Sequence, residues 1–126
     1  HLLDSAVAYA KERQQFGRAI GSFQGLQWKL VDAALELERA ASAVAWAAMC
    51  VDADTDDADA AVHSAKLEAG TAARRCARTS LQVHGGIGYT WEHGLHFWLR
   101  RAYAGDAFMG SSDYHARCLA GLLFVA

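Results

Sequence analysis

Proline is absent from this sequence, and cysteine is scarce. With no proline among the 126 residues, no position forces a helix to end or to kink. The three cysteines, Cys50, Cys76 and Cys118, are odd in number and form no CxxC pair. They argue against a disulfide framework or a zinc site and indicate reduced thiols in a cytosolic protein. We therefore expect a cytoplasmic protein.

Strong charge bias and long apolar runs are also lacking. The formal net charge is −2, which leaves no basic footprint for nucleic acid and no disordered acidic tail. No apolar stretch approaches the ~18 residues of a membrane span, and no signal-peptide pattern is present. Residues 1–126 suffice for one hydrophobic core and therefore one domain. Because a helical pattern already runs from Leu2 without a preceding Met, we expect a fragment of a longer protein.

Apolar residues recur every three or four positions along two long stretches. The first stripe comprises Leu26, Leu30, Ala33, Leu37, Ala41, Val44, Ala48 and Val51. The second comprises Ala58, Val62, Ala65, Ala69, Ala72, Cys76, Thr79 and Val83. This spacing predicts two long amphipathic helices whose alanine-rich seams approach closely, and strand signals are essentially missing. We expect an all-α fold, an antiparallel four-helix up-and-down bundle with a short additional helix.

Glycines and small polar residues mark the expected helix ends. A short loop flanked by Gly17 and Gly21 should follow the first helix. The later caps and stops, in chain order, are Ser22, Thr55, Gly85 with Gly86, Thr90, Gly105, and Ser111 or Ser112. Together they divide the chain into four or five helices.

Three motifs that suggest metal or nucleotide sites fail on closer inspection. The acidic run "DADTDDAD" lacks the glycine of a calcium loop, and a loop from Asp52 would need a glutamate where His63 stands. His93 and His96 can share a helix face, but no Glu-x-x-His motif supports a di-iron centre. "GGIGY" follows a helix and does not match GxGxxG, which excludes a Rossmann site. We expect no bound metal.

Anion binding is a more serious alternative at three places. "YAKERQQFGRAIGSFQGLQ" sets the guanidinium of Arg13 beside Phe16 and several amides, a mixture that suits a nucleotide pyrophosphate. In "LQVHGGIGYTWE", paired glycines either let an anion approach the backbone or simply end a helix. A basic helix face can meet solvent, a partner subunit or a phosphate: Arg74, Arg75 and Arg78.

Four motifs together resemble the acyl-CoA dehydrogenase family. They are "YAKERQQFG", "FQGLQWKLVD", "LQVHGGIGYTWE" and "LRRAYAGDAF", in order and covering almost the whole chain. The resemblance is to the C-terminal all-α domain of these enzymes. It implies that the N-terminal helical domain, the middle β domain and the start of the entering helix are missing from this chain. It also implies FAD as cofactor.

The resemblance assigns cofactor contacts to the first half of the chain. The arginine of the R-x-x-F-G motif, Arg13, would contact the FAD pyrophosphate across a subunit interface, and Gln15 would assist it. Phe16, Ile20 and Gln24 would line the adenosine end of the cofactor. These assignments rest on the family motif.

The second half supplies further contacts by the same resemblance. Gln82 and Gly86, from the Q-x-x-G-G segment, would approach the flavin phosphates of the neighbouring protomer. The family's R-D-A signature begins at Arg100, but its aspartate is replaced by Arg101, so the usual ion pair there is in doubt.

The catalytic base is where this sequence departs from the family. These enzymes desaturate an acyl-CoA thioester, and a carboxylate removes the α proton. The resemblance places that glutamate 24 residues after the first glycine of the pair, and counting from Gly85 leads to Met109. A thioether cannot accept the proton. Ser111 keeps a hydroxyl that would contact the flavin, and Asp113 replaces a usual glutamine.

Several interpretations remain open at this stage. The chain can belong to an active dehydrogenase whose base lies upstream of His1, or at Asp106 or Asp113. It can belong to a non-catalytic partner subunit of a heteromeric dehydrogenase, or to flavin-dependent monooxygenase relatives. A plain helical interaction module without flavin is the alternative from another class. The resemblance further implies a homo- or hetero-oligomer, as a dimer or dimer of dimers, with electron-transfer flavoprotein as acceptor.

Overall fold

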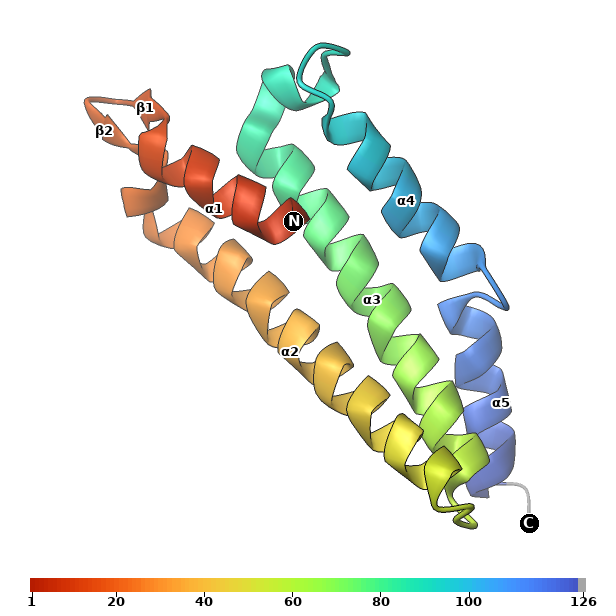
Figure 1. The fold of residues 1–126 in the computed structure, drawn as a ribbon. Coiled ribbons are helices and arrows are strands. Elements are labelled where there is room, and N and C mark those ends of the chain that lie inside the picture. The colour runs from red at the N-terminus through yellow and green to blue at the C-terminus, as the bar shows by residue number, and fades with distance from the viewer. Residues whose placement is uncertain (125–126) are drawn as a thin grey trace.

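The computed structural model describes residues 1–124 and is almost entirely helical (Figure 1). The α-helices of this part are α1 (Leu2–Glu12), α2 (Gln24–Asp52), α3 (Ala58–His84), α4 (Leu95–Ala107) and α5 (Ser112–Phe124). They are joined by a hairpin of β1 (Gln14–Gln15) and β2 (Arg18–Ala19), and by two 3₁₀ turns, η1 (Ile20–Ser22) and η2 (Gly85–Tyr89). The predicted all-α class is confirmed.

Helix α3 is the centre of the fold, since it packs against every other α-helix of the described part. Figure 1 shows α2 and α3 running antiparallel along their whole length. On the other side of α3, α4 and α5 follow one another in the same direction, so that together they complete the antiparallel bundle. The short helix α1 packs against the half of α3 that ends at His84.

Alanine fills the seam between α2 and α3. The buried residues of α2 that face it are Ala33, Ala40, Ala47 and Cys50, and those of α3 include Ala61, Ala65, Ala72 and Cys76. The alanines of α2 recur every seven residues, and the small residues of α3 recur at intervals of four and seven, which keeps one seam aligned along the two helices. Because these side chains are small, the two backbones come close, as the sequence predicts.

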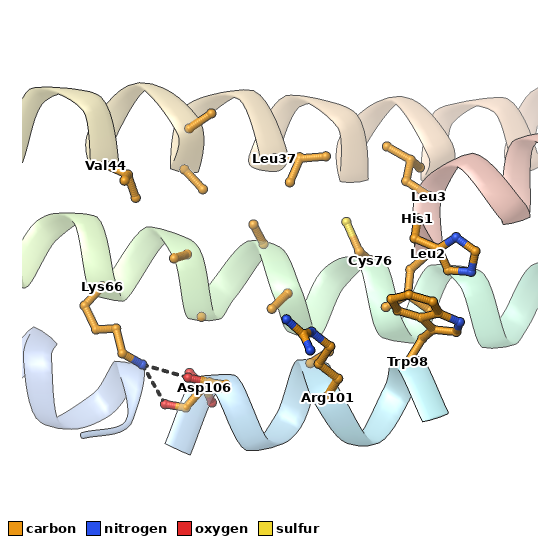
Figure 2. A pocket seen from close by; sticks show the side chains of 18 of the residues that line it. His1, Leu2, Leu3, Leu37, Val44, Lys66, Cys76, Trp98, Arg101 and Asp106 are labelled. Carbon is orange, nitrogen blue, oxygen red and sulfur yellow. Dashed lines mark hydrogen bonds between the residues drawn. The ribbon is translucent and has the colours of Figure 1, made fainter. Parts of the chain in front are cut away.

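The predicted α2 stripe is wrong in part. Leu37, Val44 and Val51 are about half exposed, because the alanine heptad occupies the seam. Leu37 and Val44 instead line a cavity of about 850 Å³ bounded by α1, α2, α3 and α4. Figure 2 shows both side chains pointing from α2 into this cavity.

The predicted start of the fourth helix at Thr90 is also wrong. The hydroxyl of Thr90 donates to the carbonyl of Ile87 at 2.8 Å and closes the 3₁₀ turn instead of capping a helix. Helix α4 begins only at Leu95, after Gly94 with φ 70°. Gly105 lies within α4, which continues to Ala107. The aromatic segment after Thr90 therefore stays irregular.

Two other predicted caps do not form. The hydroxyl of Ser22 donates to the carbonyl of Ala19, and helix α2 begins without a side-chain cap. The hydroxyl of Thr55 donates to Cys50 at the end of α2, while α3 begins after Asp57. Each hydroxyl bonds a backbone carbonyl of the preceding turn, a local bond that competes with N-capping.

A single carboxylate joins three helices near the α4–α5 turn. Asp106 pairs with Arg74 of α3 and accepts a hydrogen bond from the Ser112 hydroxyl of α5 at 2.6 Å. Lys66 of α3 donates to the Asp106 carbonyl at 2.9 Å, as drawn in Figure 2. Burial by itself raises the pKa of Asp106, but the bonds from Ser112 and Arg74 and the charge of Arg74 outweigh it. They hold the pKa below its ordinary value of 3.8.

Gly70 makes room for this carboxylate. A Cβ at position 70 would overlap both Asp106 Oδ1 and Ser112 Oγ. We expect Gly70→Ala to destabilise the protein by roughly 1–3 kcal/mol, the usual cost of overpacking. Gly105→Ala is the matched control, because its Cβ meets nothing within 4 Å and alanine favours a helix by about 1 kcal/mol. Denaturant unfolding measures both, and equal effects of the two changes would contradict this packing.

The Asp106 network also predicts a pH dependence. Since its folded pKa is lowered, the stabilisation is present above the unfolded pKa and is lost as pH falls through the folded value. At neutral pH, Asp106→Asn should cost roughly 1.5–3 kcal/mol, as for hydrogen bonds to charged groups. This difference from the wild type should shrink below pH 3.8. Unfolding midpoints across pH test it, with Asp32→Asn on the exposed face of α2 as control; a pH-independent difference would refute it.

Candidate functional site

A tight hairpin follows α1 and reverses the chain. Gln14 pairs with Ala19 and Gln15 with Arg18, although the sequence predicts only a loop. Phe16 and Gly17 form the turn with φ values of 54° and 78°, the two positive angles of a type I′ hairpin. Phe16 adopts this angle against the usual preference of a large side chain. The sequence shows no strand signal here, because each strand is only two residues long and contains no β-branched or aromatic residue.

Four predicted cofactor residues converge beside this hairpin. Arg13, Gln15, Ile20 and Gly86 line a cavity of about 360 Å³. Tyr9, Val83, His84 and Ile87 complete its wall. The cavity joins the hairpin to the far end of α3, which is about 70 residues later in the chain.

The donors around this cavity suit a phosphate group. Within residues 1–124, the exposed guanidinium of Arg13 has no carboxylate partner within ion-pair distance. The Gln15 side chain bonds only the neighbouring Gln14 carbonyl, at 2.9 Å. At Gly86 nothing lies within 4 Å of where a Cβ would be, so a ligand can approach the backbone. A guanidinium, a carboxamide and open backbone form a donor set for a pyrophosphate.

His84 is a wall residue that sequence reasoning missed. It is buried, and its Nδ1 lies 2.8 Å from the Ser80 carbonyl, which can only accept, so Nδ1 carries the proton. Tyr9 stacks on the ring at 4.6 Å between centroids, and Ser5 Oγ lies 3.4 Å from Nε2. This histidine therefore fixes α1 on α3. The sequence signal that could have identified His84 is its position directly before the glycine pair at Gly85.

The remaining predicted contacts lie outside the cavity. Gln82 accepts a hydrogen bond from Lys29 at 2.7 Å and lines a separate polar groove of about 440 Å³. Phe16 is almost fully exposed and meets Phe23 edge to face. Gln24 is the exposed first residue of α2. For these three, a cofactor contact stays a prediction.

The predicted basic face of α3 is not continuous. Arg74 turns to Asp106, and Arg75 pairs with Glu36 of α2 at 3.0 Å. Of these three arginines, Arg78 alone has no carboxylate partner among residues 1–124. Two of the three arginines therefore bind other helices of the chain.

Met109 lies in a strained turn between α4 and α5. Its φ is 58°, Gly110 follows with 104°, and the Met109 side chain is largely exposed. His115 Nε2 donates to the Met109 carbonyl at 3.0 Å, and its Nδ1 lies 2.8 Å from Nδ1 of His63. The hydroxyl of Ser111 accepts from the backbone of Tyr114 and caps α5, as one of the two predicted caps.

The two aspartates near position 109 differ in whether their carboxylates could act as a base. Both Asp106 oxygens are engaged, and its lowered pKa makes it a poor proton acceptor. Asp113 is exposed in the first turn of α5. Of the two candidates proposed from sequence, only Asp113 has an accessible carboxylate.

The hairpin cavity and the Met109 turn are separated by α3. Figure 1 shows the hairpin beyond one side of α3 and the α4–α5 junction on the other. Ser111 therefore does not join the Arg13 cluster. The cavity of about 850 Å³ lined by Leu37 and Val44 contains none of the predicted cofactor residues.

The structure also places the two arginines of the altered family signature and allows a search for metal sites and membrane spans. The guanidinium of Arg100 lies 5.6 Å from the ring centroid of Trp91, and Arg101 lines the large cavity. Across residues 1–124 no group of three histidine, cysteine or acidic side chains could hold a metal. No helix in that part is long and apolar enough to span a membrane.

Known proteins share both the sequence and the fold. "Probable acyl-CoA dehydrogenase YngJ" of Bacillus subtilis is 41% identical over 111 residues, which is 88% of this chain and 29% of that protein. The structure "FAD complex of PigA" is 32% identical with a TM-score of 0.88, covering 97% of this chain and 32% of the other. One chain of the ChsE4-ChsE5 complex from Mycobacterium tuberculosis is 31% identical with a TM-score of 0.89, covering 98% and 34%.

The chain thus spans about a third or less of the relatives it matches. Residues 1–123 match the family model described as acyl-CoA dehydrogenase, C-terminal domain. This chain belongs to the acyl-CoA dehydrogenase family.

Proposed function

We propose that this chain is the C-terminal helical domain of an FAD-dependent acyl-CoA dehydrogenase and that its hairpin cavity binds the cofactor phosphates. The convergence of Arg13, Gln15, Ile20 and Gly86 on one cavity carries the proposal. These residues come from two segments far apart in sequence, and the family motif alone does not require them to share a cavity in one chain. The FAD complex among the similar structures supports the cofactor.

Each residue of the cavity has a distinct task in this proposal. Arg13 offers two parallel N–H donors to phosphate oxygens, a geometry that lysine cannot supply. Gly86 leaves the backbone open, and Ile20 gives an apolar wall. FAD held by these residues would supply the hydride-accepting chemistry of the desaturation. The residues of this chain bind and orient; none in the cavity moves a proton.

The Met109 turn serves a different flavin from the one at the hairpin. The position of the two places on different sides of α3 supports this separation. We infer that the hairpin cavity reaches the cofactor of a neighbouring protomer, while Ser111 contacts the cofactor of its own. A homo- or hetero-oligomer is then required for either site to be complete.

The proposed function also needs a carboxylate that removes the α proton. The thioether of Met109 cannot accept the α proton, and Asp106 is held by Arg74 and Ser112. We propose that the carboxylate comes from upstream of His1, with Asp113 as the alternative within the chain. The substrate is an acyl-CoA and the electron acceptor is electron-transfer flavoprotein, in the cytoplasm.

A second candidate is a non-catalytic partner subunit of a heteromeric dehydrogenase. The methionine at the base position favours it, and a complex of two named proteins among the similar structures supports it. Turnover of an acyl-CoA panel by the full-length protein alone would exclude this candidate.

Removing the Arg13 guanidinium should weaken flavin binding. A charge-assisted hydrogen bond contributes roughly 1.5–3 kcal/mol, so Arg13→Ala in the full-length protein should bind FAD about ten- to a hundredfold more weakly. Arg18→Ala is the control, since Arg18 lies on the other strand and stacks over Phe23 at 4.1 Å. Bound flavin per subunit and a fluorescence titration measure the effect. Equal affinity of the two variants, or no flavin in the wild type, contradicts the proposal.

Restoring a carboxylate at position 109 tests the catalytic interpretation. General-base catalysis contributes about 10²–10⁴ in rate, so Met109→Glu should raise acyl-CoA desaturation by at least about a hundredfold if the wild type lacks a base. Met109→Gln has nearly the same shape but no basic oxygen, and it should change little. Equal rates for the two variants would mean that position 109 does not face the α carbon.

A further inference from the structure

Two histidines from different helices share one proton beside the Met109 turn. Nδ1 of His63, on α3, lies 2.8 Å from Nδ1 of His115, on α5, although the two residues are 52 positions apart in the chain. Their ring centroids are 5.0 Å apart. His115 is buried and His63 is partly buried. Two imidazole nitrogens at this distance form a hydrogen bond, so one of them, and not both, carries a proton.

The other nitrogen of His115 is bonded to the turn. Nε2 of His115 lies 3.0 Å from the Met109 carbonyl. A carbonyl can only accept, so Nε2 carries a proton whenever this bond is present. The ring also lies directly on the turn, since a Cβ at Gly110 would be 2.8 Å from Nε2. His115 therefore links the histidine pair to the backbone of the turn.

The turn depends on this link because its backbone has a disfavoured conformation. Met109 has a φ of 58° and Gly110 a φ of 104°. A left-handed angle at a methionine costs free energy that the surroundings must offset. Within residues 1–124 the Met109 carbonyl accepts from no other side chain. Loss of the bond from His115 would therefore allow Met109 to relax to a more favourable angle.

Two of the three charge states of the pair keep the link. In the neutral pair, Nδ1 of His63 donates to the bare Nδ1 of His115. With one positive charge, a single proton still lies between the two Nδ1 atoms, and each Nε2 carries another. With two positive charges, both Nδ1 atoms carry protons, which cannot face each other at 2.8 Å, and the rings must separate. Histidine ordinarily changes charge between about pH 5 and 8, and repulsion between the rings moves the second protonation to the acidic end.

No carboxylate compensates for the second charge. Within residues 1–124 neither histidine has a carboxylate within ion-pair distance. On α4, Asp106 is paired with Arg74, and Lys66 of α3 donates to the last carbonyls of that helix. The other titratable and charged groups that flank the pair are Asp59 on α3, Asp113, Tyr114, Arg117 and Cys118 on α5, and Asp52, Asp54, Asp56 and Asp57 at and after the end of α2.

We propose that His115 is a positioning residue for the Met109 turn and that the proton it shares with His63 makes the turn sensitive to pH. The turn is held while the pair carries at most one positive charge, and it is released when both rings are charged. The pair and its bond to the turn do not depend on flavin binding. An effect on the cofactor rests on the proposed function, in which Ser111 contacts the flavin and is displaced when the turn is released.

Replacing either histidine by an amide tests the shared proton. In the full-length flavin-loaded protein with isotope-labelled methionine methyl groups, the NMR signal of Met109, assigned by its loss in Met109→Leu, should shift as pH falls from about 8 to about 5. His63→Asn should abolish this shift, because an amide can donate to a bare Nδ1 or accept from a protonated one. His115→Gln should also abolish it, since its N–H groups replace the Nε2 donor and do not titrate. Both variants should keep the wild-type signal at pH 8.

His96→Asn is the control for loss of a histidine. His96 lies against the rings of Trp91 and Phe97 at the beginning of α4, whereas the Met109 turn follows the end of that helix. The wild-type shift should remain in this variant. If one amide variant does not fold, as judged by its unfolding temperature, the other decides the test.

The outcomes separate this proposal from the proposed function. A Met109 signal that is independent of pH in the wild type, or an equal shift in the wild type and in His63→Asn, overturns the role of the histidine pair. A shift that disappears in both amide variants, while the flavin absorption spectrum of the wild type stays constant with pH, supports the pair. That result would count against a contact between Ser111 and the flavin.

Discussion

The Asp106 carboxylate fixes the point where the chain passes from α4 to α5. Arg74 and Ser112 hold its two oxygens, and the missing side chain of Gly70 leaves the space in which it lies. Because the carboxylate bonds α3 and α5 at once, the turn that carries Met109 cannot move without breaking a largely buried ion pair. The same network removes Asp106 from any catalytic role. The Asp106 carboxylate therefore contributes both to stability and, together with the bond from His115 to the Met109 carbonyl, to the position of the candidate active-site turn.

The alanine seam of α2 and α3 is the second constraint, and it sets where ligands can meet the chain. Small residues at intervals of four and seven bring the two helices together, and α3 lies in the middle of the bundle. His84 holds α1 and the hairpin on one side of α3. The Met109 turn lies on the other. In the proposed function, these two places are half-sites of different flavins, and each is completed by another part of the assembly.

Local sequence patterns were sufficient for the helix content and for the ends that single residues decide, such as Gly85. They were insufficient wherever a partner distant in sequence decided the outcome. Arg74 fits a basic face in the sequence because its partner Asp106 lies 32 positions away. Leu37 fits the apolar stripe because only the packing of α2 on α3 shows that the alanines form the seam. The proposed cofactor residues follow from the family resemblance, because composition and spacing alone do not single them out. His84 was missed because its role is visible only when Tyr9 and Ser5 are placed beside it.

Met109 in the sequence is one apolar residue in a turn, and the structure gives that turn a defined shape, held by His115 and separated from Arg13 by α3. The central claim is that these two places serve different flavins. A structure of the full-length protein with FAD tests it most directly. Arg13 should then lie on the phosphates of one flavin and Ser111 of the same chain beside another. A single flavin that touches both residues of one chain, or an Arg13 remote from any phosphate, would contradict it.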